Sequence, residues 1–318
     1  MFRIALCLIA AFYPSLASAD GVVASIKPVH SLVAAVMQGD ARQPEVLLSG
    51  SQSLHSLSLR PSQAKMLADA QVVFYISDRF ELFMDKALTG APKTLRRVAL
   101  DAAPGLTLLP ARMSQGFEAH QHEHEHEHEH EHHDHEDGHA AHHDDAALSD
   151  LHLWMSPANA KLMVQTIARE LSALYPDKQA LYQHNAAALL KKLDELDSAL
   201  AARMKKLQGR PFIVFHDATQ YFEARYGLSA AGSITVHPER GLSAGHVAAI
   251  RKKVSDAQVL CVFREPQFED QIIHNLLEGT RARSVMIDPE GALLEPGAAL
   301  YFQLIEAVAA GFESCLAA

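Results

Sequence analysis

The feature that most constrains this chain is a stretch of 31 residues without proline or glycine, from Asp177 to Leu207. The stretch is rich in alanine, leucine and lysine, and its large apolar residues recur at helical spacing. Asp177 can cap a helix at its start, and glycine and proline at positions 209 and 211 end it. Such a helix is about 45 Å long, enough to join two lobes rigidly. A coiled-coil dimer helix is the alternative, although the apolar stripe is short.

Short apolar or β-branched segments alternate with helical patterns on both sides of this helix. The expected strands are Val22–Ile26, Glu45–Leu48, Val72–Ile76, Arg97–Leu100, Phe212–Phe215, Ser233–Val236, Val259–Phe263 and Ser284–Ile287. The expected helices are Val29–Gln38, Pro61–Ala70, Arg79–Leu88, Ala218–Tyr226, Ser243–Val254, Glu269–Glu278 and Gly297–Ala310. This alternation predicts an α/β fold with two parallel-sheet lobes joined by one long rigid helix. We expect an N-terminal lobe over 20–157, a helical segment over 158–208 and a C-terminal lobe over 209–318.

The N-terminus has the pattern of a secretory signal peptide. One positive charge precedes an apolar run from Ile4 to Tyr13, and Ala17-Ser18-Ala19 forms a small-residue cleavage site. We therefore expect residues 1–19 to be removed by cleavage after Ala19, which leaves a secreted chain. A retained N-terminal anchor is the alternative. No later stretch approaches 18 uninterrupted apolar residues, so we expect no membrane-spanning helix in the mature chain.

Two cysteines remain after this cleavage, Cys261 and Cys315. In an oxidising compartment, such a pair favours a disulfide over a metal site. Because Cys261 lies in an apolar strand pattern, a buried free thiol is the alternative.

The segment from Glu118 to Asp145 carries the excess of negative charge. It holds 11 of the 38 acidic residues, 12 of the 20 histidines and no lysine or arginine. The net charge of −10 therefore belongs to this segment. The rest of the chain is close to neutral, without a basic patch for nucleic acid. Because the segment has almost no apolar residues to bury, we expect residues 118–147 to form a disordered loop.

Histidine and carboxylate side chains at this density bind divalent transition metals. We predict weak, exchangeable zinc sites formed by His120, His122, His124, His126, His128, His130, His132, His133, His135, His139, His142 and His143. A solvated acidic linker without a function is the alternative. The repeat also matches the H-E-x-x-H pattern of zinc proteases at 124–128, but that motif needs a buried amphipathic helix, for which this segment has no apolar face.

Three further residues lie where ligands bind in open α/β sheets, at or near the carboxyl ends of strands, and a fourth, His152, lies just after the histidine-rich segment. His216 directly follows the expected strand at 212–215, and Asp288 follows the one at 284–287. His55 lies in the loop after the strand at 45–48, and His152 precedes a helix opened by Ser156-Pro157. Three imidazoles and one carboxylate make a tetrahedral Zn²⁺ site, so we predict these four residues as its ligands.

Three of these four residues lie in segments through which the chain resembles the ZnuA-type periplasmic zinc-binding proteins of Gram-negative bacteria, which serve ABC importers, and His55 lies just before a further such segment. The segments are SLRPS at 58–62, DLHLWMSP at 150–157, FHDA at 215–218, FREPQF at 263–268 and IDP at 287–289. The resemblance covers nearly all of the mature chain. It implies two lobes joined by a long helix, one metal in the cleft between the lobes, and an acidic, histidine-rich loop near that cleft.

The resemblance also implies which residues bind the metal. The metal histidines of the family match His55, His152 and His216, and its disulfide matches Cys261 and Cys315. Relatives that take Mn²⁺ or Fe²⁺ have a carboxylate where this chain has His216, which favours zinc here.

The fourth ligand is where the chain departs from some zinc members. They have a glutamate before the first histidine, whereas this chain has Leu54, which cannot coordinate. The fourth ligand is then Asp288, a water or a loop histidine, and we favour Asp288 because it neutralises charge. We expect Glu265 to orient the site without binding the metal.

We therefore predict a monomeric periplasmic protein that captures Zn²⁺ and delivers it to the membrane permease of an ABC importer for high-affinity zinc uptake. The histidine-rich loop is expected to gather zinc, and the chain is not expected to be an enzyme. The alternatives are a periplasmic zinc buffer or chaperone and a secreted zinc hydrolase, which needs an open coordination position beside a general base. Three imidazoles also bind Cu²⁺, Ni²⁺ and Cd²⁺ well.

Overall fold

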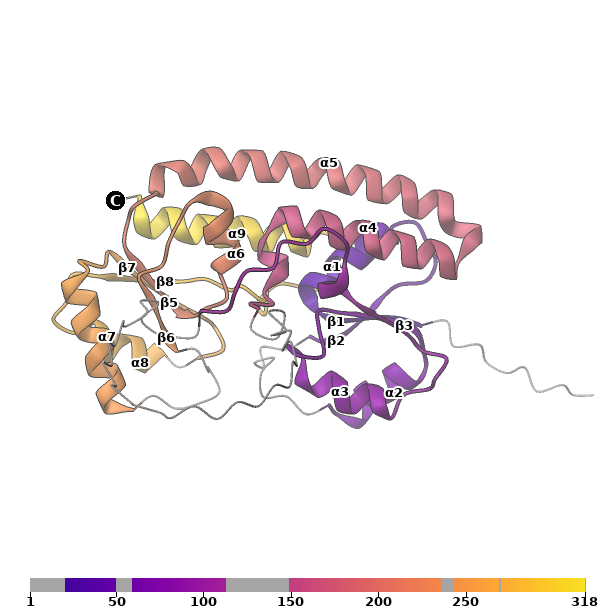
Figure 1. The fold of residues 1–318 in the computed structure, drawn as a ribbon, viewed down its shortest axis with the longest axis horizontal. Helices are drawn as coiled ribbons and strands as arrows, with labels where there is room; N and C mark the ends of the chain where they lie inside the picture. The colour runs from indigo at the N-terminus through magenta and orange to yellow at the C-terminus, as the bar shows by residue number, and fades with distance from the viewer. Residues whose placement is uncertain (1–20, 50–58, 113–148, 236–242, 269, 318) are drawn as a thin grey trace, which may run out of the picture.

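The computed structural model describes residues 21–49, 59–112, 149–235, 243–268 and 270–317. They form two lobes, each built on a four-stranded parallel sheet with helices packed around it (Figure 1). The predicted signal peptide with its cleavage site, His55 and the histidine-rich segment 118–147 lie outside the described residues. No helix in the described part of the chain is long and apolar enough to cross a bilayer.

The N-terminal lobe contains a sheet with the strand order β2-β1-β3-β4, in which every neighbouring pair is parallel. Its strands are β1 (Gly21–Ile26), β2 (Glu45–Leu48), β3 (Ala70–Tyr75) and β4 (Arg96–Ala99), and its helices are α1 (Lys27–Val36), α2 (Pro61–Ala68) and α3 (Leu82–Thr89). The central strands β1 and β3 are almost entirely buried and apolar, as expected of parallel strands whose two faces are both covered.

The C-terminal lobe repeats this arrangement with the strand order β6-β5-β7-β8, again all parallel. Its strands are β5 (Phe212–His216), β6 (Gly232–Thr235), β7 (Cys261–Arg264) and β8 (Arg283–Met286), and its helices are α6 (Gln220–Tyr226), α7 (Ala244–Asp256), α8 (Asp270–Leu277) and α9 (Leu300–Leu316). All eight predicted strands are present, shifted by at most two residues at either end, so the predicted α/β fold is confirmed.

The predicted long helix is also confirmed. Helix α5 (Gln179–Met204) is flanked by the 3₁₀ turns Pro176–Lys178 and Lys205–Leu207, so helical structure runs through the whole predicted range. Figure 1 shows α5 extending along one side of the molecule over both lobes. Its apolar stripe packs inside this chain, against α1, α4 (Pro157–Leu174) and α9, and Leu193 and Leu200 are completely buried. The stripe that would form a coiled-coil dimer is therefore already covered.

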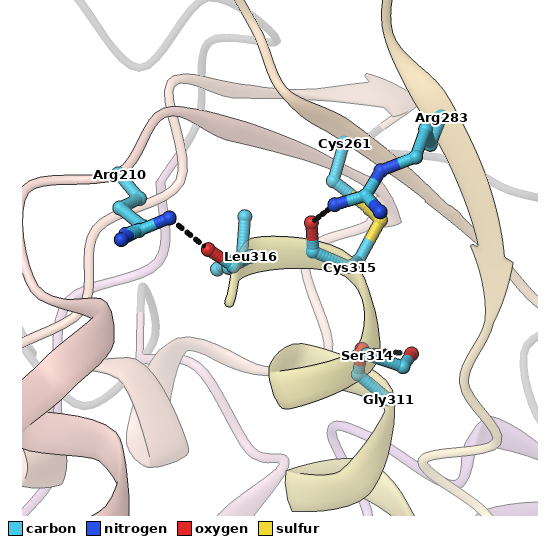
Figure 2. The surroundings of a disulfide bond; sticks show 7 residues. All are labelled: Arg210, Cys261, Arg283, Gly311, Ser314, Cys315 and Leu316. Carbon is cyan, nitrogen blue, oxygen red and sulfur yellow. Dashed lines mark hydrogen bonds between the residues drawn. A yellow bond between two sulfur atoms is a disulfide. The ribbon is translucent and has the colours of Figure 1, made fainter. Parts of the chain in front are cut away.

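The predicted disulfide joins Cys261, at the start of β7, to Cys315, near the end of α9, with a Cα–Cα distance of 5.9 Å. Figure 2 shows that Arg283 donates to the carbonyl oxygen of Cys315 and Arg210 to that of Leu316. The last carbonyl groups of a helix have no partner within it, so the two guanidinium groups satisfy acceptors that the helix itself leaves open. The C-terminal end of α9 is thus fixed to the second sheet.

The other end of α9 contacts the N-terminal lobe. Near the start of the helix, the backbone N–H of Tyr301 donates to Ser31 Oγ at 2.8 Å, and its phenol donates to the carbonyl oxygen of Trp154 at 2.8 Å. Helix α9 therefore packs against α1 as well as the second sheet. The lobe boundaries drawn from the sequence at 157/158 and 208/209 stay predictions.

Replacement of Cys261 and Cys315 by alanine should lower the free energy of unfolding by about 4 kcal/mol. The reason is that the disulfide closes a chain segment of 54 residues and so restricts the unfolded state. Urea unfolding of the oxidised wild type and the double variant measures the difference. Reductant should bring the wild type to the midpoint of the variant and leave the variant unchanged. Equal midpoints for the oxidised wild type and the variant would contradict the prediction.

Candidate metal centre

His216 is the last residue of β5 and is held by a carboxylate from the neighbouring strand β7. Glu265 follows β7, and its Oε1 accepts hydrogen bonds from the backbone N–H of His216 at 3.2 Å and from Nδ1 at 2.7 Å. Both side chains are buried. Because β5 and β7 are parallel neighbours, their carboxyl ends place the two residues together. The expectation that Glu265 orients the site agrees with this contact.

His152 is held in the same way by its own carboxylate. It directly precedes a 3₁₀ turn at Leu153–Met155, which leads into α4. Asp150 Oδ1 accepts from the backbone N–H of His152 at 2.9 Å and from its Nδ1 at 2.7 Å. The ring of Phe80, which lies just after β3, packs edge-on against the imidazole with ring centroids 5.0 Å apart. The hydrogen bond from Nδ1 to Asp150 and the contact with Phe80 together fix the orientation of the His152 ring.

The two imidazoles meet at their Nε2 atoms, which lie 3.4 Å apart. A carboxylate only accepts hydrogen bonds, so each ring carries a hydrogen on Nδ1, and Nε2 is the nitrogen of each ring that is left to bind a metal. Two nitrogen ligands at about 2.0–2.1 Å from a tetrahedral Zn²⁺ lie about 3.4 Å from each other. The separation of the two Nε2 atoms therefore fits a pair of ligands to one zinc ion.

The charges around His216 favour its protonated form in the absence of a metal. Burial alone would lower the pKa of the His216 imidazole. The charge and hydrogen bond of Glu265 oppose burial, Glu290 and Asp217 add to them, and together they raise this pKa above its ordinary value. A cation at Nε2 therefore enters a region of negative potential.

Glu290 is a second buried carboxyl group beside His216. Its pKa is raised to about 8, mainly by burial and also by the charges of Glu265 and Asp288, while His216 and a hydrogen bond from Gln267 Nε2 at 3.3 Å act in the opposite direction. The group lies in the loop between β8 and α9 and is 9% exposed. A carboxyl group in such surroundings is a candidate for a functional site.

The carboxylate of Asp288, the predicted fourth ligand, accepts hydrogen bonds from backbone groups of the same loop. Its Oδ1 accepts the backbone N–H of Ala292 at 3.0 Å, and its Oδ2 accepts that of Leu293 at 2.9 Å. Among the described residues, no three His, Cys, Asp or Glu side chains are gathered in a group that could hold a metal ion. The structure thus brings His152 and His216 together. His55 lies outside the described residues, and the role of Asp288 as a metal ligand stays a prediction.

Sequence reasoning did not single out Asp150 and Glu290. Asp150 stands two residues before a predicted ligand, and a carboxylate so close in sequence is a usable signal for a residue that orients a histidine. Glu290 stands two residues after Asp288, and nothing in the local pattern tells which of the two carboxyl groups is buried and interacts with His216.

The residues on both sides of the histidine-rich segment lie beside this centre. Pro110 forms an antiparallel bridge with Ser149, and Arg112 forms ion pairs with Asp217 and Glu223. Asp217 is the residue directly after His216. The described residues on either side of 113–148 therefore lie close to residues that neighbour the two imidazoles.

The sequence model of the family described as zinc-uptake complex component A, periplasmic, matches residues 22–315. The chain belongs to this family. Within it, the chain is 43% identical over 307 residues to the high-affinity zinc uptake system protein ZnuA of Brucella abortus (strain 2308), covering 93% of this chain and 92% of the relative. The corresponding protein of Yersinia pestis is 33% identical over 302 residues, covering 95% of this chain and 92% of the relative.

Solved structures share the fold. The laminin-binding protein Lmb of Streptococcus agalactiae matches with a TM-score of 0.73 at 22% identity, over 93% of this chain and 99% of that chain. A zinc-bound deletion mutant of ZnuA matches with a TM-score of 0.72 at 25% identity, over 94% of this chain and 98% of that chain. The resemblance seen in the sequence is confirmed. The members of the family to which the chain belongs are periplasmic components of zinc uptake.

In the metal-free protein, Glu265→Gln should lower the pKa of the His216 imidazole, because the largest effect that opposes burial is removed. NMR titration of the imidazole measures this pKa. The raised pKa also means that the pair stabilises the fold below about pH 6.5 and that this contribution fades as the pH rises through the folded-state pKa.

A suitable control for this titration is Glu170→Gln, which removes a carboxylate that pairs with Arg96 instead of a histidine. The control should leave the pKa of His216 unchanged. An unchanged or higher pKa of His216 in Glu265→Gln would show that Glu265 does not set its charge.

Proposed function

We propose that this protein captures Zn²⁺ in the periplasm and delivers it to the membrane permease of an ABC importer. The observation that carries the proposal is the pair of buried imidazoles, whose Nε2 atoms lie 3.4 Å apart and whose Nδ1 atoms each bond to a carboxylate. Orientation of a metal-binding histidine by a carboxylate is the usual arrangement at zinc sites. The relatives support the same role, since they are named for high-affinity zinc uptake.

The proposed ligands are His55, His152 and His216, with one carboxylate from the loop between β8 and α9. Imidazole nitrogen suits zinc better than it suits hard cations such as Mg²⁺ or Ca²⁺, which need oxygen ligands. Asp288 remains the carboxylate predicted from the sequence. Glu290 is favoured by its burial and its electrostatic interaction with His216, whereas both oxygens of Asp288 already accept backbone N–H groups.

The carboxylates around the two imidazoles favour a role in metal binding without catalysis. The two carboxylates nearest the imidazoles are each engaged with an Nδ1 atom, so their task is to orient ligands and not to activate a water. We propose that the protein acts as a monomer, because the apolar stripe of α5 is covered within the chain. The histidine-rich segment gathers zinc next to the site, since its flanking residues lie there.

The wild type should bind one Zn²⁺ tightly at the centre, and excess Mn²⁺ should fail to displace it. His216→Ala should lose this tight site, because it removes one of the two converging nitrogen atoms. Competition calorimetry on the mature protein measures both. His184→Ala, which removes an exposed histidine of α5, is the matched control and should bind as the wild type does.

The same calorimetry can reject the proposal. If binding is weak and multiple in the wild type and unchanged in His216→Ala, the two imidazoles do not form a zinc site. The protein would then be a zinc buffer that works through its histidine-rich segment.

Deletion of residues 118–145 should leave one tight zinc site and remove several weak ones. The reason is that the deletion takes away 12 histidines but none of the proposed ligands. Calorimetric titration of the metal-free deletion variant counts the sites of each class. Loss of the tight site would show that the segment itself supplies a ligand. Uptake of radioactive zinc by zinc-starved cells that carry the deletion then tests whether the segment aids capture.

A further inference from the structure

Lys27 is a buried lysine that connects the two lobes. It is the first residue of α1, directly after β1, and is 6% exposed. Its Nζ donates to the carbonyl oxygens of Ala292 at 2.7 Å, Leu294 at 2.9 Å and Gly291 at 3.3 Å. An ammonium group has three hydrogens to donate, so the three carbonyl groups take up its full capacity.

The three carbonyl groups belong to the loop of residues 288–294, which joins β8 to α9. As described above, the carboxylate of Asp288 accepts the N–H groups of Ala292 and Leu293 in this loop. A cation therefore binds the carbonyl groups of the loop, and an anion binds its amide groups. Hydrogen bonds that polarise the same peptide groups in one direction reinforce one another, so Lys27 and Asp288 together hold the loop in one conformation.

The loop also contains Glu290, a buried carboxyl group that interacts electrostatically with His216. The carbonyl oxygen of Pro289, just before Glu290, accepts from Trp154 Nε1 at 2.7 Å, and that of Gly291, just after it, accepts from Lys27. Both donors come from segments that precede the long helix, whereas His216 ends a strand of the second sheet. The distance between Glu290 and His216 is therefore set by contacts that reach across the two lobes.

We propose that Lys27 is a positioning residue for zinc binding, which fixes residues 288–294 of the loop between β8 and α9 so that Glu290 keeps its position relative to His216. Lys27 acts on the peptide groups of the loop and does not touch the metal. The inference rests on the proposed function, because it concerns how the same site is completed. A lysine that merely stabilised the packing of the lobes would affect the whole molecule evenly and not this loop in particular.

The first experiment uses the metal-free protein and compares Lys27→Met with the wild type by NMR amide hydrogen exchange. The amides of Ala292 and Leu293 should exchange at least tenfold faster in the variant, while those of β3 keep their protection. Ser31→Ala is the matched control. It removes another buried contact between α1 and α9, that with the Tyr301 amide, and should leave the loop amides as they are.

The second experiment measures zinc affinity by competition with a chelator in a double-mutant cycle of Lys27→Met and Glu290→Gln. Residues that orient a metal site from outside it typically change metal affinity by 10–100-fold, and we expect a loss of about that size for Lys27→Met. If Lys27 acts through Glu290, its loss should matter much less in the Glu290→Gln background. The visible spectrum of the Co²⁺-loaded protein should change in Lys27→Met and stay constant in Ser31→Ala.

These outcomes separate the inference from the proposed function. If the wild type binds no zinc tightly, both fail. If the wild type binds zinc but Lys27→Met binds equally well, or if the two substitutions in the cycle are simply additive, the inference on Lys27 is wrong and the proposed function stands. If Lys27→Met does not fold, Lys27→Arg takes its place, because a planar guanidinium keeps the charge but cannot direct its hydrogens at three carbonyl groups of one turn.

Discussion

The centre depends on two buried hydrogen bonds, each between an imidazole Nδ1 and a carboxylate. Without them either ring could rotate or carry its hydrogen on the other nitrogen, and the two Nε2 lone pairs would no longer converge. Asp150 and Glu265 each accept from the ring and from the backbone N–H of the same histidine, through a single oxygen. The direction of each ring therefore follows from the path of its own main chain. Charge-assisted bonds compensate the burial of one oxygen of each carboxylate, whereas Asp150 Oδ2 and Glu265 Oε2 are buried without a hydrogen bond among the described residues.

Each histidine is held by its own carboxylate, so within the centre the two lobes meet through the imidazole rings. The separation of the two Nε2 atoms is consequently a measure of how the lobes sit against each other. Helices α5 and α9 both pack along the two lobes, and the carbonyl groups of loop 288–294 bind donors from the N-terminal half of the chain. Large rotations of one lobe would break several of these contacts together, so release of a bound ion is better served by small local movements.

The architecture could be predicted from sequence because it follows from strong local signals. Parallel strands buried on both faces leave continuous apolar runs, and α5 is a long segment without any helix-breaking residue. The ends of strands then located His216, and the pair of cysteines in a secreted chain indicated the disulfide. Loop geometry was beyond this reasoning. The conformation of the loop that holds Asp288 and Glu290 depends on which of its peptide groups Lys27 and Trp154 bind, and these partners are more than 130 residues away in sequence.

The contacts of α9 have a consequence for the order in which the molecule can be completed. Ser31 and Trp154 belong to the first half of the chain, yet their partner Tyr301 lies near its end. A nascent chain is made from its N-terminus, so the side of α1 that packs on α9 stays uncovered until α9 has been made. The disulfide between Cys261 and Cys315 can form only after Cys315 has been made. A frameshift or early stop that removed α9 would therefore affect both lobes. It would expose the apolar surfaces that α9 covers, on α1 and on the second sheet, to chaperones and proteases.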